Sequence, residues 1–341
     1  MGLTENFVDE REEKLARIDD ALKDSGRFRL GAFEGPEAGE FGGVDAMIAA
    51  VNEKLRDPLK FFGAESEPRS VRLSQNVLEF DSMGLTGSVN DVARATVHVS
   101  GRKRRRAAII VPHWNGREDS YDAMARALSW FGFSTFVLTL PHHHVRSATA
   151  ERQVANEFLN ADLGAAIRSV RQSVCDVRSL VTWLYTEGYA EVHLIGVSLG
   201  SCVAALAAAF DPRLISTSLF LTAGDFAETV WNGRATQHIR ATLDPCIEFA
   251  QLKSIWAIIS PSSFLDLFRK NEVRLLMVNG RRDKVVPFHS TVRFVNELRT
   301  AGVNVQWRVL PCGHYTLADP PFSWWSLLLA VWFMSRSRKR L

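Results

Sequence analysis

Six short apolar runs between residues 107 and 311 constrain the fold of this chain more than any other feature. They cover residues 107–112, 134–140, 192–197, 215–223, 273–279 and 305–311. Helical patterns separate them, and several are rich in β-branched residues. Continuous apolar runs are typical of strands buried on both faces, as in a parallel sheet covered by helices. The sequence therefore predicts an α/β fold. Alternating segments at 71–82 and 93–101 are expected to add antiparallel strands at one edge.

The remaining segments divide the chain into two predicted parts. Residues 1–66 carry amphipathic patterns at 9–24 and 44–62, separated by a glycine-rich loop, and are interpreted as an N-terminal helical extension. Residues 67–341 are assigned to the sheet-containing domain. Within it, residues 225–270 form a connection too long for a bare loop and rich in aromatic side chains, which predicts a structured cap insertion over a pocket.

The net charge and the composition of the two ends of the chain limit which partners and which cellular location are expected. The net charge is only +3 and the basic residues are spread out, so nothing indicates nucleic acid. The first twenty residues are charged and lack the apolar segment of a signal peptide, which predicts a cytoplasmic protein. Residues 322–341 are apolar and then basic. Burial beneath the N-terminal helices is the favoured interpretation, with a homodimer contact or a peripheral membrane contact as alternatives.

The motif G-x-S-x-G at residues 196–200 is the first indication of a catalytic residue. Ser198 follows an apolar run and precedes an alanine-rich helical segment, and Gly196 and Gly200 flank it where side chains would clash in a sharp turn. Such a turn exposes the serine hydroxyl and places the Leu199 N–H at a helix N-terminus, where it can bind an oxyanion. The alternative is a purely structural turn from strand to helix.

Two further residues favour the catalytic interpretation. Asp283 and His314 each follow the end of a later apolar run. In open α/β sheets, functional residues lie at the carboxyl ends of the strands. A serine needs a base held in the right tautomer by an acid, which predicts a Ser198–His314–Asp283 triad. Asp225 is a rival for the acid, although an aspartate at that place more often caps a helix. This chemistry requires no cofactor and no metal.

With these residues the chain resembles the α/β-hydrolase superfamily over about residues 67–335. The matching segments are GVSLG at 196–200, GRRDKVVP at 280–287 and CGHYT at 312–316. More narrowly, 171–184, 196–208 and 254–264 resemble a bacterial branch from which no substrate is inferred. The resemblance implies a mostly parallel, eight-stranded sheet with helices on both faces and a cap after the sixth strand.

The resemblance also implies where the second oxyanion donor lies. Relatives use a residue that follows a His-Gly pair, and Pro112-His113 stands there in this chain, which places the donor at Trp114. His113 then either holds this loop by a hydrogen bond or contacts substrate.

The sequence thus predicts a serine hydrolase that cleaves an ester with an apolar acyl or aromatic group. The expected substrate-binding residues are His113, His142, Trp231 and Trp256. Residues 142–144 are three consecutive histidines. They are expected either to line the rim of the pocket or to lie in a solvated loop. A metal site is the least favoured alternative. An acyltransferase with the same triad and a non-catalytic scaffold of the same fold are the alternative functions.

Overall fold

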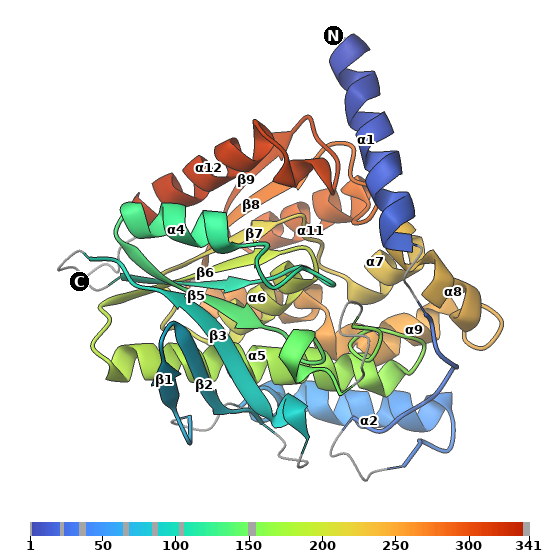
Figure 1. Ribbon diagram of the computed structural model, residues 1–341. Helices are drawn as coiled ribbons and strands as arrows, with labels where there is room; N and C mark the ends of the chain where they lie inside the picture. Colours follow the sequence, from blue (N-terminus) through green and yellow to red (C-terminus); the bar gives the residue numbers. More distant parts are fainter. Residues whose placement is uncertain are drawn as a thin grey trace.

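The computed structural model describes residues 2–20, 24–33, 39–63, 68–83, 88–101, 106–148 and 155–336. Its strands form one sheet in the order β1-β2-β3-β5-β4-β6-β7-β8-β9 (Figure 1). The sheet therefore has nine strands, and the prediction of eight was wrong. The edge strand β1 is only three residues long and all three are exposed, so it has no buried apolar pattern that would distinguish it from a turn.

The strands lie close to where the apolar and alternating runs predicted them. They are β1 (Arg72–Ser74), β2 (Val77–Asp81), β3 (Val92–His98), β4 (Arg106–Val111), β5 (Phe133–Thr139), β6 (Glu191–Val197), β7 (Ser216–Phe220), β8 (Arg274–Gly280) and β9 (Asn304–Leu310). Strands β1, β2 and β3 pair antiparallel, and β3 pairs antiparallel with β5. The pairs β5–β4, β4–β6, β6–β7, β7–β8 and β8–β9 are all parallel. Because they are parallel, the carboxyl ends of β6, β7, β8 and β9 meet at one edge.

Helices cover both faces of this sheet, as predicted. The helices of the described residues are α1 (Gly2–Asp20), α2 (Val44–Arg56), α3 (Pro58–Phe61), α4 (Asp122–Trp130), α5 (Leu163–Thr186), α6 (Leu199–Phe210), α7 (Phe226–Asn232), α8 (Gln237–Leu243), α9 (Phe249–Trp256), α10 (Leu265–Lys270), α11 (Phe288–Thr300) and α12 (Phe322–Arg336). Side chains of α5, α6 and α11 share the larger apolar core with one face, and those of α4 and α12 share a second core with the other. Helices α7 to α10 fill the connection between β7 and β8, where the cap was predicted.

The N-terminal segment is part of the larger core. Phe33, Met47 and Val51 are buried in it. The ring of Phe62 lies 4.7 Å from that of Phe210 on α6. Phe33 and the segment 39–62 therefore pack against the sheet domain and share its core; the predicted boundary near residue 66 lies outside the described residues.

Helix α12 packs differently from the favoured expectation. It buries Ala330, Phe333 and Met334 in the core that it shares with α4 on the sheet, so burial beneath the N-terminal helices was wrong. This face of the sheet offers the apolar side chains Ile195 and Val278, which explains the placement. Trp324, Leu328 and Trp332 stay exposed, so the homodimer and membrane contacts remain predictions. In the part of the chain that the structure describes, no helix is long and apolar enough to cross a membrane.

Candidate active site

Ser198 lies on a strained turn between β6 and α6. Its backbone angles are φ 53° and ψ −121°, a conformation that a non-glycine residue adopts only when its surroundings impose it, at a cost of roughly 1–3 kcal/mol. The Ser198 N–H donates to the Phe220 carbonyl at the end of β7 with a length of 2.9 Å. The side chain is half-buried. The sequence-predicted elbow is therefore present as a sharp turn at the carboxyl edge of the sheet.

The two flanking glycines allow this turn to pack. A Cβ on Gly196 would lie 2.5 Å from the Gly200 carbonyl oxygen, and one on Gly200 would lie 2.2 Å from the carbonyl oxygens of both Val111 and Pro112. The end of β4 thus presses directly against the first turn of α6. This contact brings the loop that carries Trp114 beside the turn that carries Ser198 and Leu199, as the oxyanion hypothesis requires.

Asp283 and His314 are in direct contact. His314 Nδ1 lies 2.9 Å from Asp283 Oδ2. The other carboxylate oxygen, Oδ1, accepts the N–H groups of Val285 and Val286 at 2.9 and 2.8 Å. Asp283 is buried, and three hydrogen bonds satisfy its charge and fix its orientation. The carboxylate therefore holds the proton of His314 on Nδ1, which leaves Nε2 able to accept one.

Asp225, the alternative candidate for the acid, caps a helix. Its side chain accepts the Glu228 N–H at 2.9 Å and so caps α7. It also lies 2.8 Å from Lys253 Nζ. These contacts match the helix-cap interpretation, and the geometry pairs His314 with Asp283 instead.

The loop after β4 is held from two sides. Tyr121 accepts the His113 N–H at 3.1 Å and lies 2.6 Å from His113 Nδ1, so His113 has the loop-holding contact that was one of its two expected roles. On the other side, His143 Nε2 accepts the Asn115 N–H at 3.2 Å, and its Nδ1 donates to the Pro141 carbonyl at 2.8 Å. The second histidine of the cluster therefore supports the loop of the predicted oxyanion donor.

Burial keeps His143 neutral and lowers its pKa to about 3. An unfolded histidine titrates near pH 6.5, so between these values only the unfolded chain binds the proton and stability falls as pH falls. We expect the free energy of unfolding to be lower at pH 5 than at pH 7.5, and the difference to be smaller in His143→Gln. Urea unfolding at both values measures this. A His143→Gln protein that keeps the full pH dependence of the wild-type protein would contradict the assignment.

His142 does not share this role. Its Nδ1 lies 3.0 Å from Glu157 Oε2, its backbone N–H donates to the Asn90 side chain at 3.1 Å, and its side chain is half-buried. These contacts tie His142 to the 155–160 segment. A contact between His142 and substrate remains a prediction.

The predicted aromatic contacts divide into two groups. The Trp114 ring stacks on His238 of α8 with centroids 6.3 Å apart, and Trp231 packs on Phe249 within the cap at 5.3 Å. Trp256, in contrast, is fully buried and donates its indole N–H to the Leu163 carbonyl. It is a core residue between the cap and α5, so its assignment to substrate binding was wrong. An apolar run in a cap insertion has the same composition whether it lines a pocket or closes a core.

Two charged residues that support the site were not predicted from the sequence. Arg146 is buried just beyond His143 and forms an ion pair with Asp176 of α5 at 2.8 Å. Glu12 of α1 is buried against the residues around His314. A charge at a buried position gives no signal in a single sequence, although Glu12 does occupy the buried stripe of an amphipathic helix between Val8 and Ala16.

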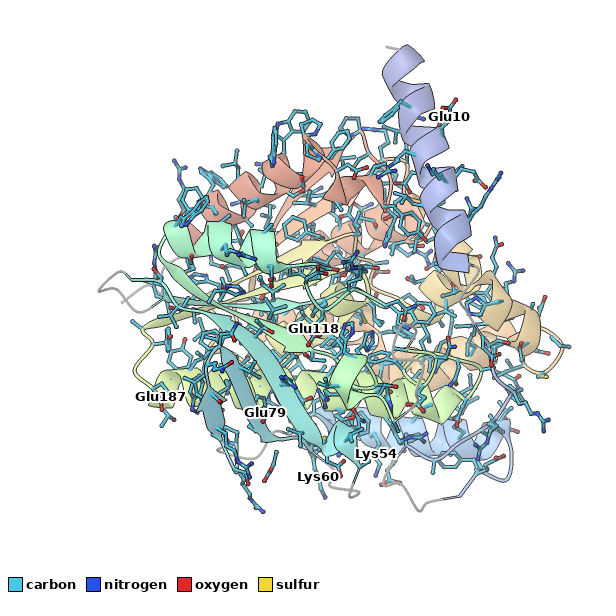
Figure 2. The ribbon with its side chains drawn as sticks, in the orientation of Figure 1. Glu10, Lys54, Lys60, Glu79, Glu118 and Glu187 are labelled. Carbon is cyan, nitrogen blue, oxygen red and sulfur yellow. The ribbon has the colours of Figure 1, made fainter. Side chains whose placement is uncertain are left out.

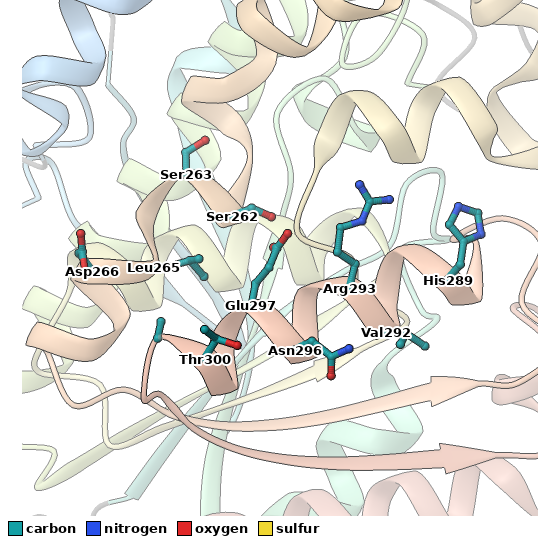
Figure 3. Close-up of a pocket in the computed structure, with 11 residues that line it drawn as sticks. Ser262, Ser263, Leu265, Asp266, His289, Val292, Arg293, Asn296, Glu297 and Thr300 are labelled. Atoms are coloured by element: carbon teal, nitrogen blue, oxygen red, sulfur yellow. The ribbon is translucent and has the colours of Figure 1, made fainter.

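A groove elsewhere on the surface is distinct from this site. It has a volume of about 810 Å3 and lies between the segment 262–266 and α11 (Figure 3). Its walls include Arg293, Glu297 and Asp266, and none of its lining residues belongs to the predicted triad.

Comparison with known proteins agrees with this architecture. A family model described as alpha/beta hydrolase domain containing 18 matches residues 136–239, a stretch that includes Ser198 but neither Asp283 nor His314. Among solved structures, acetyl xylan esterase 1 from Thermoanaerobacterium sp. JW/SL YS485 superimposes with a TM-score of 0.59 at 16% identity, over 91% of this chain and 97% of that one. The chain has the α/β-hydrolase fold.

Other α/β-hydrolase neighbours differ in their chemistry. A thermostable carboxyl esterase from Bacillus coagulans matches with a TM-score of 0.58 at 12% identity, over 77% of this chain and 99% of its own. The Pyrococcus horikoshii acylaminoacyl peptidase matches with 0.57 at 12% identity, over 81% of this chain but only 43% of its own. No curated protein matches the sequence. At these identities the likeness establishes the fold, and the activity has to be argued from the site.

Proposed function

We propose that this α/β-hydrolase-fold protein is a serine hydrolase that cleaves carboxylic esters through an acyl-enzyme intermediate. The observation that carries the proposal is the 2.9 Å contact between His314 Nδ1 and Asp283, at the same sheet edge as the strained Ser198 turn. A purely structural turn from strand to helix does not require an aspartate–histidine pair in the neighbouring loops. The esterases and peptidases among the structural neighbours support the same reaction class.

The residues have complementary roles in the proposed cycle. Ser198 Oγ attacks the acyl carbonyl while His314 Nε2 takes its proton, and Asp283 stabilises the imidazolium that forms. The N–H groups of Leu199 and Trp114 donate to the oxyanion. His314 returns the proton to the departing alcohol, and water then releases the acyl group by the same steps in reverse.

The surroundings favour an apolar substrate. The Trp114 ring stacks on His238 of the cap, and within the cap Trp231 packs on Phe249. Aromatic walls favour an uncharged acyl or aromatic group, because a charged group would lose its hydration there without a partner.

A fluorophosphonate probe tests the proposed nucleophile. Attack by Ser198 Oγ on phosphorus forms a covalent bond and expels fluoride, with His314 accepting the hydroxyl proton. Intact mass spectrometry should show one adduct on the wild-type protein and none on Ser198→Ala. An unlabelled wild-type protein, or equal labelling of both, would contradict the proposal. A panel of p-nitrophenyl esters of increasing chain length then defines the acyl preference.

A further inference from the structure

We propose that the first helix, α1, completes the active site, with Glu12 as a positioning residue that holds the loop carrying His314. The inference rests on the proposed triad for its catalytic meaning. Its structural basis is a set of contacts between segments about 300 positions apart in the sequence.

Glu12 binds the backbone on both sides of the histidine side chain. Its Oε2 accepts the His314 N–H at 3.0 Å, and its Oε1 accepts the Thr316 N–H at 2.6 Å. The same loop is closed by the Gly313 N–H, which donates to Thr316 Oγ1 at 2.9 Å. The carboxylate of α1 therefore supplies acceptors for two N–H groups of the loop.

The close approach is built into both partners. A Cβ on Gly313 would lie 2.2 Å from the Glu12 carboxyl carbon, so a larger residue at position 313 would force this carboxylate to move. Glu12 is 9% exposed, between the buried Val8 and Ala16 on the same helix face. A carboxylate at such a position is strongly unfavourable unless hydrogen bonds replace its hydration. The two backbone N–H groups do so, which makes the contact specific.

Flanking ion pairs direct this face of α1 toward the site. Asp9 pairs with Arg282, next to the triad aspartate, at 2.5 Å. Glu13 pairs with Arg234, at the start of the cap, through two contacts of 2.5 and 3.0 Å. The bond to Arg234 lowers the pKa of Glu13 to about 2, so this pair stays ionised in mildly acidic solution. Helix α1 thus connects the acid loop, the histidine loop and the cap (Figure 1).

These contacts have a consequence for catalysis. The imidazole of His314 must face Asp283 with Nδ1 and Ser198 with Nε2, and its direction depends on the backbone that Glu12 holds. A displacement of about 1 Å in such a group can reduce the rate about 100-fold. The first twenty residues, which carry none of the motifs of the fold, would then set the efficiency of the triad.

Two substitutions of Glu12 test this inference. Glu12→Ala removes both acceptors, whereas Glu12→Gln keeps the size and one acceptor oxygen, so it should fold even where the alanine variant does not. We expect kcat for p-nitrophenyl butyrate, per fluorophosphonate-titrated site, to fall about 100-fold in Glu12→Ala and about tenfold in Glu12→Gln, with little change in KM. Proton NMR should show the low-field His314 Nδ1–H signal weakened in both variants.

Glu10→Ala is the matched control, because Glu10 is exposed on the outward side of the same helix (Figure 2) and should leave kcat and the signal unchanged. A merely structural Glu12 would lower the number of titrated sites and leave kcat per site intact, and that result would overturn the inference. So would a full His314 signal in both variants. If the wild-type protein is neither labelled nor active, the proposed function fails, while the NMR comparison still decides whether Glu12 positions His314.

Discussion

Asp283→Asn is expected to reduce kcat/KM for aryl esters about 10⁴-fold, the order of effect found when a triad aspartate loses its charge. The reason lies in the three hydrogen bonds of this side chain. The N–H groups of Val285 and Val286 both donate to Oδ1, so an asparagine must place its carbonyl oxygen there. Its NH2 group then faces His314 Nδ1 and donates to it. The histidine proton is forced onto Nε2, and the base can no longer accept the Ser198 proton.

Ester hydrolysis and the rate of fluorophosphonate labelling measure this effect, with the melting temperature as a check on folding. Asp225→Asn is the control. Asparagine is as good a helix cap as aspartate, so this variant should retain nearly full activity. A large loss in Asp225→Asn together with a small loss in Asp283→Asn would reassign the acid.

Arg146→Met is expected to destabilise the protein by about 3–5 kcal/mol, because it leaves Asp176 as an unpaired buried charge. Both side chains are 1% exposed. Arg146 also donates to the carbonyl groups of Thr139 and Asn90 at 2.8 and 2.9 Å. It therefore ties the loop that carries His143 to β5, α5 and the segment ahead of β3. Urea unfolding should show a lower midpoint with an unchanged slope.

The double variant Arg146→Met/Asp176→Leu separates charge burial from packing. Removing both charges should recover most of the lost stability, since a buried ion pair is often replaceable by apolar side chains of similar volume. A double variant as unstable as Arg146→Met would show that the loss came from the carbonyl contacts and not from the orphaned carboxylate.

Most of the sheet, apart from the short edge strand β1, and the elements that carry the predicted chemistry follow from local patterns in the sequence. Apolar runs such as 192–197, separated by helical patterns, are typical of strands buried on both faces of a parallel sheet, and the carboxyl ends of parallel strands meet at one edge. The positions of Ser198, Asp283 and His314 relative to strand ends follow from that rule. Gly196 could be interpreted without coordinates because the turn itself excludes a side chain there, whereas Gly200 also leaves room for the Val111 and Pro112 carbonyls at the end of β4.

The tertiary structure decided everything that depends on which distant segments meet. Trp256 and Trp231 belong to the same aromatic segment, but only packing shows that the first is closed in the core and the second is half-buried in the cap. His143 supports the loop of the predicted oxyanion donor although its neighbour His142 does not, because consecutive residues point in different directions. Glu12 and His314 are 302 positions apart, and no periodicity in a single sequence records such a contact. Local sequence fixes what each element is, whereas the shape of the assembled core determines which side chains meet.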